Sequence, residues 1–358
     1  MTHLWLRAET KEFEKRSPLT PQDCKILQQA DFKLTVEASS TRIFTNDEFS
    51  SAGCEIVEAG SWRAAPQNAF ILGLKELPDE DLPIIHHHIY FAHVYKGQEG
   101  AEQLLNRFKH GGGSLFDLEY LKDDEGRRIA AFGHWAGFVG AALAVKAFCH
   151  KIKYPNQPFP ALSAFNNQNK LIESLLTNLS NSARRPSVLI IGALGRCGKG
   201  ALDALELLNL EATQWDLQET KDGGPFKEIT EHDIFINAAL INHKIPPFIT
   251  PELLNQGSKL SVISDVSCDP NSELNPIPLY REVGDWESPM VTTQFKNNVE
   301  SLPLEILAVD NLPSVLPRES SRDFSGQLTP FLLQLTSDKN ALDMVWKNSF
   351  SEFEKNLN

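Results

Sequence analysis

Short apolar runs alternate with helix-type stretches along most of the chain. Within the first 93 residues, five runs have the composition of β-strands: 3–7, 32–37, 54–57, 69–74 and 88–93. Thr20-Pro21 predicts a helix start after the first of them, because threonine caps free N–H groups and proline suits the first turn. Alternating strands and helices predict an α/β fold with largely parallel sheets.

The second half of the chain carries a sharper pattern. The apolar run 187–191 leads directly into a glycine turn at 192–198 and then into a helical stretch at 199–210. Further strands are predicted at 212–216, 233–240, 259–266 and 304–313.

Between the two blocks we predict a strand at 127–133, a helix of small residues at 135–148 and a loop at 151–170. Small residues at helical spacing suit a helix that packs closely against another surface, such as a connector between domains. The last helices are expected at 322–335 and 339–355, where they return to the first block.

The glycine turn has the features of a dinucleotide site. Gly192, Gly195 and Gly198 follow a GxxGxxG spacing between a strand and a helix, which differs from the more common GxGxxG. Glycines let a pyrophosphate approach the backbone, and the helix start offers free N–H groups. Asp216 ends the next strand, 21 residues after Gly195, where a carboxylate binds the ribose of NAD and repels the 2′-phosphate of NADP. The alternative is that the glycines serve packing only.

Charged residues gather at the ends of the strands predicted in the first block. In parallel sheets these ends meet at one edge, so several cations there suit a substrate with several carboxylates. Each residue taken singly is also compatible with a solvated strand end. The residues are Lys11, Arg16, Lys75, Glu76, His93, Lys96, Glu119, Arg127 and Arg128.

The composition of the chain limits which binding partners and which cellular location are expected. The 34 basic and 47 acidic residues give a formal charge of −13, which argues against a nucleic-acid partner. The five cysteines are scattered without a CxxC pair, and no apolar run approaches the ~20 residues of a membrane span. The start of the chain lacks a secretory pattern, so we expect a cytoplasmic protein without a membrane partner.

Two other motifs are assigned structural roles. His86, His87 and His88 are adjacent, point in alternating directions on a strand and lack further spaced ligands, so we predict no metal. The glycines at 111–113 are predicted to end a helix rather than to bind phosphate.

Seven motifs together resemble one enzyme family almost from end to end. They are RAETKxxExR at 7–16, GLKE at 73–76, FAHVYKGQ at 91–98, DLEYL at 117–121, GRRIAAFGHWAGF at 126–138, LIIGALGRCGKGA at 189–201 and LPSVLPRE at 312–319. The chain resembles the NAD-dependent, lysine-forming saccharopine dehydrogenases, and more distantly alanine dehydrogenase and nicotinamide nucleotide transhydrogenase.

The resemblance implies two Rossmann-like domains with parallel sheets and an active-site cleft between them. Residues 1–133 with 322–358 would form the substrate domain, and residues 134–321 the NAD domain. Saccharopine would be oxidised by NAD and hydrolysed to L-lysine and 2-oxoglutarate, the small-molecule partners. The family also favours a monomer.

The same resemblance implies a role for individual residues. Lys75 matches the base that deprotonates the substrate amine, His93 matches the group that activates water, and Glu76 and Glu119 match the carboxylates that tune their pKa values. The residues implied for substrate are Lys11, Arg16, Lys96, Gln98 and Arg127. Those implied for NAD are Arg128, Phe132, Gly195, Arg196, Asp216, Thr220, Val266, Asp310 and Leu312. Arg196 as solvated surface and Phe132 as a core residue remain open alternatives.

One departure from the family concerns redox chemistry. Some members carry a cysteine that can pair with the one in the glycine loop, but Ala238 stands at that position here, which excludes such a bond to Cys197. Two other functions remain open: an amino-acid dehydrogenase of the alanine dehydrogenase type, and an NAD(H) sensor without catalysis.

Overall fold

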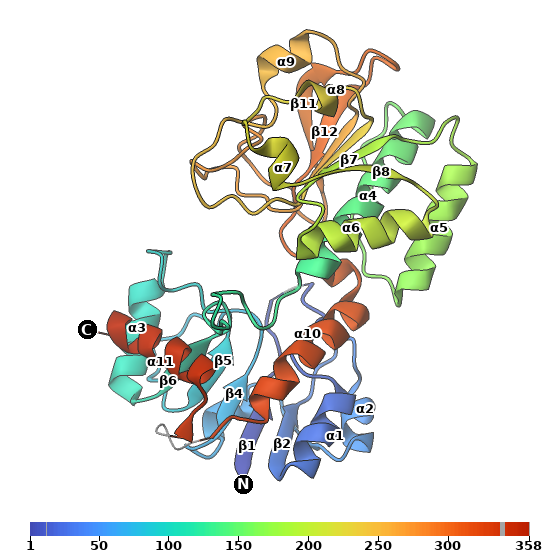
Figure 1. The fold of residues 1–358 in the computed structure, drawn as a ribbon. Helices are drawn as coiled ribbons and strands as arrows, with labels where there is room; N and C mark the ends of the chain where they lie inside the picture. Colours follow the sequence, from blue (N-terminus) through green and yellow to red (C-terminus); the bar gives the residue numbers. More distant parts are fainter. Residues whose placement is uncertain (12, 337–340, 358) are drawn as a thin grey trace. The chain divides into compact units, whose positions relative to one another are not determined.

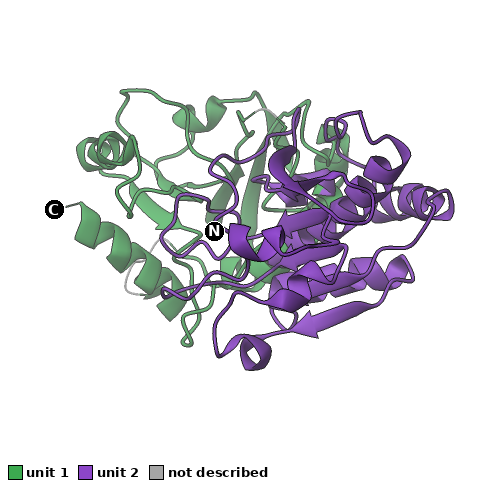
Figure 2. Ribbon diagram, turned by 90° about the horizontal axis from the view of Figure 1, so that it is seen from above, with its two compact units in different colours: residues 1–131, 317–358 green, residues 132–316 purple. Residues whose placement is uncertain are grey.

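A computed structural model describes residues 1–11, 13–336 and 341–357. The chain forms two compact units, shown in different colours in Figure 2. Unit 1 comprises Met1–Ala131 with Pro317–Asn358, and unit 2 comprises Phe132–Leu316. The breaks lie after 131 and 316, whereas the sequence analysis placed them after 133 and 321. Helix α10 explains the second difference, because it starts at Pro317 and its Arg318 pairs with Glu48 of unit 1 at 2.9 Å.

Unit 1 is built on a six-stranded, all-parallel sheet in the order β3-β2-β1-β4-β5-β6 (Figure 1). The inner strand β4 and the edge strand β6 are both buried along their length, as expected for a sheet covered on both faces. The strands are β1 Thr2–Leu6, β2 Phe32–Glu37, β3 Glu55–Val57, β4 Phe70–Leu72, β5 His87–Tyr90 and β6 Ser114–Asp117.

The helices of unit 1 begin and end as their local sequence dictates. Thr20 accepts the N–H of Asp23 ahead of Pro21, which confirms the predicted helix start. Gly112 ends α3 in the left-handed conformation, which confirms the predicted helix end. The helices are α1 Pro21–Gln29, α2 Asn46–Ser51, the 3-10 helix η1 Ser61–Ala64, α3 Ala101–Gly111, α10 Pro317–Leu332 and α11 Met344–Asn356. The start of the helix predicted at 339–355 lies outside the described residues.

Unit 2 contains the second six-stranded sheet, in the order β11-β12-β10-β9-β7-β8. All neighbours pair in parallel except β11, which runs antiparallel to β12 at one edge. The strands are β7 Val188–Ile191, β8 Ala212–Trp215, β9 Ile234–Asn237, β10 Val262–Asp265, β11 Met290–Lys296 and β12 Pro303–Leu307.

Helix α4 is the small-residue helix expected from the sequence, and it packs against α6. A Cβ on Gly137 would lie 1.8 Å from the Cys197 carbonyl oxygen, and one on Gly200 would lie 1.8 Å from that of His134. Glycine is therefore required where the two helices touch. The helices of unit 2 are α4 Gly133–Lys153, α5 Gln168–Ser180, α6 Arg196–Leu207, α7 Leu217–Thr220, α8 Lys227–Thr230, α9 Pro251–Asn255 and the 3-10 helix η2 Leu312–Val315.

The strand predicted at 127–133 is wrong. The segment forms only an isolated bridge between Lys122 and Arg128 after a turn in which Asp123 accepts the N–H of Arg127 at 2.8 Å. Further on, the N–H of Ala131 donates to the side chain of Gln327 rather than to a strand. The backbone of this segment therefore bonds within a turn and to a side chain, and not to a neighbouring strand as the apolar run alone had suggested.

Candidate active site

The glycine turn of unit 2 joins β7 to α6. Gly192 has a φ of +87°, and a Cβ on Gly198 would lie 2.1 Å from the Gly192 carbonyl oxygen, so the fold itself requires both. Gly195 differs, because its Cβ would meet nothing closer than 3.4 Å and its φ of −72° suits any residue. The space beside Gly195, next to the N–H groups that start α6, therefore fits a pyrophosphate.

Asp216 lies where a ribose-binding carboxylate is expected. It caps α7 directly after β8, and its Oδ2 accepts the N–H of Leu194 in the glycine turn at 2.9 Å. Its Oδ1 accepts the N–H of Leu217, while Thr220 Oγ1 donates to its main-chain oxygen. A carboxylate has about four acceptor positions, so Asp216 retains capacity for ribose hydroxyls.

Three exposed leucines surround this turn and were missed from the sequence. Leu194, Leu217 and Leu240 are 68%, 81% and 88% exposed. They follow the ends of β7, β8 and β9, which are neighbours in the sheet. Exposed apolar side chains beside a phosphate-binding turn suit a flat base such as adenine. The available signal was a single leucine in a loop after each strand end.

The other residues expected at NAD lie in different settings. Phe132 precedes α4, Arg196 begins α6, and the N–H of Val266 donates to Asn237 directly after β10. Asp310 is exposed, whereas the Leu312 side chain is 3% exposed and belongs to the core of unit 2. Arg128 belongs to unit 1.

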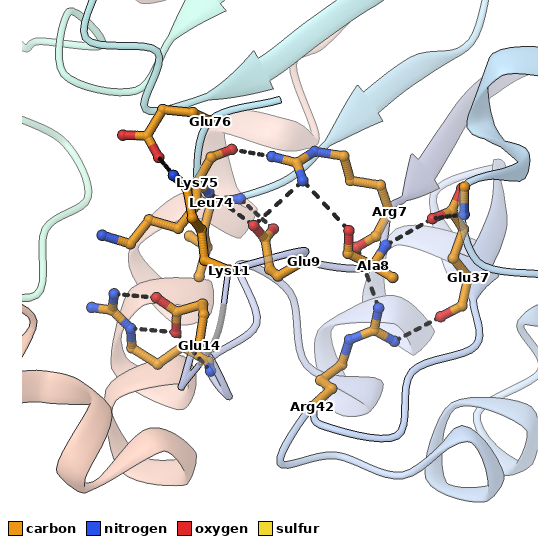
Figure 3. A network of polar contacts seen from close by, with 12 residues as sticks. Arg7, Ala8, Glu9, Lys11, Glu14, Glu37, Arg42, Leu74, Lys75 and Glu76 are labelled. Carbon is orange, nitrogen blue, oxygen red and sulfur yellow. Dashed lines mark hydrogen bonds and ion pairs between the residues drawn. The ribbon is translucent and has the colours of Figure 1, made fainter. Parts of the chain in front are cut away.

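Lys75 lies three residues after the end of β4 in unit 1, and buried charged side chains bind its backbone. Its N–H donates to Glu9 at 3.0 Å, and its carbonyl oxygen accepts from Arg7 (Figure 3). Arg7 is buried and pairs with Glu9 at 3.4 Å. A Cβ on Gly73 would lie 2.3 Å from the Arg7 guanidinium, so glycine is needed there. The contacts of Arg7 and Glu9 therefore fix the backbone at Lys75.

Glu14 and Arg16 form a buried pair near Lys75. Arg16 donates to both oxygens of Glu14, at 2.8 and 2.6 Å (Figure 3). Burial raises the pKa of Glu14, but Arg16 and, to a smaller extent, the Lys75 ammonium outweigh it, so the net pKa is lowered. Arg16, expected to bind a substrate carboxylate, is thus buried and paired with a carboxylate of the chain.

His93 lies between the two glutamates that were expected to tune it. Its Nε2 is 3.9 Å from Glu76 Oε1, and its Nδ1 is 3.8 Å from Glu119 Oε2. The residue has a φ of 55°, an uncommon backbone conformation that clusters at functional sites. Its ring stacks nearly parallel to Phe91, at 18°.

The same glutamates connect His93 to two lysines. Lys11 Nζ lies 3.8 Å from Glu76, and Lys96 Nζ lies 2.8 Å from Glu119. Burial raises the pKa of Glu119, but Lys96, with smaller contributions from Arg128 and His93, outweighs it, so the net pKa of that carboxyl is lowered. Both lysine side chains remain more than half exposed and can meet a ligand.

The remaining predicted residues of unit 1 lie farther from this cluster or are engaged locally. Gln98 accepts the N–H of Lys96 at 2.8 Å. Arg127 is exposed and pairs with Asp123 at 3.0 Å and Glu125 at 2.7 Å. Its guanidinium therefore belongs to the turn at 123–127.

Sequence reasoning missed a buried network behind Lys75. Glu37 accepts the N–H groups of Ala8 and Trp62, at 2.9 and 2.7 Å, and Arg42 donates to the Arg7 carbonyl oxygen. The charges of Glu37 and Arg42 are readable from the sequence, but their burial is not.

The structure also bears on metal sites, membrane spans and disulfide bonds. His86 Nε2 contacts the Ala65 carbonyl oxygen, and His88 packs edge-on against Trp62. Among residues 1–11, 13–336 and 341–357, no group of His, Cys, Asp or Glu side chains has the arrangement of a metal site. Over those residues no helix is both long and apolar enough to cross a membrane. Among the described residues, Cys197 takes part in no disulfide bond.

Two family models place the chain in the alanine dehydrogenase/PNT class. The family models of its N-terminal and C-terminal domains match residues 5–139 and 206–353. Solved structures of this class share the fold: an L-alanine dehydrogenase has a TM-score of 0.65 at 15% identity, covering 99% of this chain and 94% of that one. A transhydrogenase from Sinorhizobium meliloti has a TM-score of 0.59 at 16% identity, covering 92% and 93%.

Closer relatives define the family within this class. The saccharopine dehydrogenase [NAD(+), L-lysine-forming] of Emericella nidulans is 48% identical, covering 99% of this chain and 97% of its own. The protein of the same name from Schizosaccharomyces pombe is 46% identical, covering 98% and 97%. The chain belongs to the family of NAD-dependent, L-lysine-forming saccharopine dehydrogenases.

Proposed function

We propose that this chain catalyses the reversible, NAD-dependent cleavage of saccharopine to L-lysine and 2-oxoglutarate, in lysine metabolism by the α-aminoadipate route. The observation that carries the proposal is the cluster of Lys75, Glu76, His93 and Glu119 beside the ends of β4, β5 and β6. This cluster combines a lysine whose backbone is fixed by buried charges with a histidine that lies between two carboxylates.

The first chemical requirement is a base for the substrate nitrogen. The secondary amine must be neutral before hydride can leave the adjacent carbon, and Lys75 accepts its proton in our proposal. The buried Arg7–Glu9 pair fixes the backbone from which Lys75 extends. NAD supplies the hydride acceptor.

The second requirement is proton transfer to and from water. Oxidation yields an imine, water adds to it, and the carbinolamine then collapses to amine and ketone. An imidazole suits each of these transfers, because it accepts and donates protons near neutral pH. His93 performs them here, with Glu76 and Glu119 stabilising its protonated form from both sides.

Saccharopine carries three carboxylates, and cations around the cluster would bind them. Lys11 and Lys96 are exposed and adjacent to the glutamates, so we assign them to this role. Gln98, Arg127 and the buried Arg16 are the other candidates. Charge-assisted bonds of this kind both orient a substrate and strengthen its binding.

NAD is assigned to the glycine turn of unit 2. The space beside Gly195 supports a pyrophosphate there, with Arg196 as a charge contact and Asp216 on the ribose. Leu194, Leu217 and Leu240 would contact the base. The other candidates are Arg128, Phe132, Thr220, Val266, Asp310 and Leu312.

An assay of NADH oxidation tests the proposal. We expect turnover with L-lysine plus 2-oxoglutarate and none with pyruvate plus ammonia. Turnover only with ammonia would replace the proposal by an amino-acid dehydrogenase of the alanine dehydrogenase type. Tight NADH binding without turnover on any amine would identify a sensor.

A monomeric state and a cytoplasmic location are further parts of the proposal. Sedimentation of the purified chain at several concentrations tests the first, and fractionation of the native host tests the second.

A further inference from the structure

Asp117 is a buried carboxylate beside the proposed proton-transfer cluster and has no role so far. It is the last residue of β6, directly opposite Tyr90 of β5, and its exposed fraction is 0%. Glu119 follows two residues later on the same chain segment, and His93 follows β5. Asp117 thus lies at the point where both segments leave the sheet.

The contacts of Asp117 connect these two segments. Its Oδ1 accepts the N–H of Glu119 at 2.9 Å, and the N–H of Ala92, next to His93, also contacts the carboxylate. Its main-chain oxygen accepts from Tyr120 N–H at 2.9 Å and from Ser349 on α11 at 3.3 Å. The side chain therefore holds the backbone at Glu119 and at Ala92, the residue that precedes His93.

This anchoring has a reason in the conformation of His93. A left-handed backbone at a residue other than glycine costs about 1 kcal/mol or more, so surrounding contacts must hold it. The Ala92 contact with Asp117 immediately precedes the strained position.

The charge of Asp117 acts on the same group. Its Oδ2 is buried and accepts no hydrogen bond among the described residues. Burial, together with the negative charge of Glu119, raises the pKa of the Asp117 carboxyl to about 6, although the N–H groups of Glu119 and Ala92 and the charge of His93 act to lower it. The Tyr90, Tyr95 and Tyr120 hydroxyls also interact with the Asp117 charge, and Glu352 of α11 interacts in turn with Tyr95 and Tyr120.

We propose that Asp117 is a positioning residue of the saccharopine-cleaving site, whose carboxylate orients the segments bearing His93 and Glu119 and whose negative charge stabilises the protonated imidazole. This inference rests on the proposed function. Asp117 acts through His93 and does not itself touch the substrate.

Two substitutions separate orientation from charge. Asp117→Asn keeps an oxygen for the Glu119 N–H but removes the charge, whereas Asp117→Ala removes both. We expect Asp117→Asn to lower the proton affinity of His93 about threefold to tenfold and to shift the corresponding limb of the kcat/KM pH profile to lower pH. Asp117→Ala should reduce kcat about 10-fold to 100-fold at neutral pH, with a smaller change in KM.

A direct titration of His93 makes the test independent of turnover. The imidazole resonance, assigned with a His93→Gln variant, is followed against pH by NMR in the wild-type chain and in Asp117→Asn. Asp47→Asn removes a charge from an exposed position on α2 and should leave the His93 titration unchanged. Circular dichroism verifies that each variant is folded; if Asp117→Ala does not fold, Asp117→Asn alone decides.

The outcomes separate the two proposals. If the wild-type chain turns over lysine and 2-oxoglutarate but His93 titrates identically in Asp117→Asn, the role of Asp117 is refuted and the activity stands. If the wild-type chain shows no turnover, the proposed function fails, and the inference about its site falls with it. A shifted titration with a matching shift in the pH profile supports both.

Discussion

Each unit ends a central or edge strand with a buried aspartate, and the two residues are satisfied very differently. In unit 2, Asp265 at the end of β10 accepts from Asn237 at 2.9 Å and from the Tyr280 hydroxyl at 2.6 Å. In unit 1, one oxygen of Asp117 has no hydrogen-bond partner among the described residues. Burial raises the pKa of both carboxyls, but in Asp265 the bonds from Tyr280 and Asn237 offset part of that effect. A buried carboxylate with an unbonded oxygen is a feature that calls for an explanation, and such features are common at functional sites.

The same contrast extends to the strand ends as a whole. In unit 1 the strand ends carry ionisable side chains that lie 2.8–3.9 Å from one another, and this proximity suits proton transfer. In unit 2 they carry a glycine turn at the start of α6 and exposed leucines, which suits a phosphate and a flat base. One sheet architecture thus supports acid–base chemistry or dinucleotide binding, according to its loops.

The largest expected effect is at Lys75. Lys75→Met should lower kcat by about 10²-fold or more, the usual range for loss of a general base, without weakening NADH binding. The pH dependence of kcat/KM measures it: the limb that belongs to the base should disappear. A variant with the wild-type profile would exclude Lys75 as the base.

The two aspartates should respond to substitution in opposite directions. Asp265→Ala leaves two buried donors without an acceptor and should destabilise unit 2 by about 2–4 kcal/mol. Asp117→Asn removes a carboxylate whose pKa is raised to about 6. Below the pKa of the unfolded chain, about 3.9, the carboxyl is protonated in both states and folding stability is unaffected. Above pH 6 the buried carboxylate is ionised, and the full loss of folding stability is present.

Asp117→Asn should therefore be more stable than the wild type by about 2–3 kcal/mol at pH 8, with the difference vanishing near pH 4. Urea unfolding followed at both pH values measures this, with Asp47→Asn as the charge control. Equal stabilities at pH 8 would mean that the Asp117 carboxylate is not strained by its burial.

The glycine turn offers a matched pair of substitutions. Gly198→Ala places a Cβ 2.1 Å from a carbonyl oxygen and should lower the melting temperature of unit 2. Gly195→Ala has room and should melt normally, yet raise the Kd for NADH about tenfold by filling the phosphate space. Normal NADH affinity in Gly195→Ala would place the pyrophosphate elsewhere.

The smallest expected effect concerns cofactor choice. Asp216→Ala should weaken NAD binding by roughly tenfold and reduce discrimination against NADP, because the carboxylate no longer repels the 2′-phosphate. Kd values for both dinucleotides measure this. An unchanged preference would remove Asp216 from the ribose site.

Several fold elements were predicted correctly from local signals alone. The apolar runs at 32–37 and 187–191 coincide with β2 and β7, and Thr20-Pro21 starts α1. The strand at 127–133 failed because a side-chain acceptor on α10 takes the N–H of Ala131, which is a partner almost two hundred residues away. The edge strand β11 was missed because its alternating exposure depends on its pairing with β12.

The sequence by itself determined the alternation of strands and helices, the glycine turn and the identities of Lys75, His93 and Asp216, since these depend on short-range periodicity, turn chemistry and residue type. Only the tertiary structure decided that Glu76 and Glu119 lie on either side of His93, that Arg16 is buried against Glu14, and that Asp117 lacks a full set of partners. These properties depend on which strands are neighbours in the sheet. Strand order brings together segments that are far apart in the chain. Burial then changes the pKa of each ionisable group and the strength of its interactions with its neighbours.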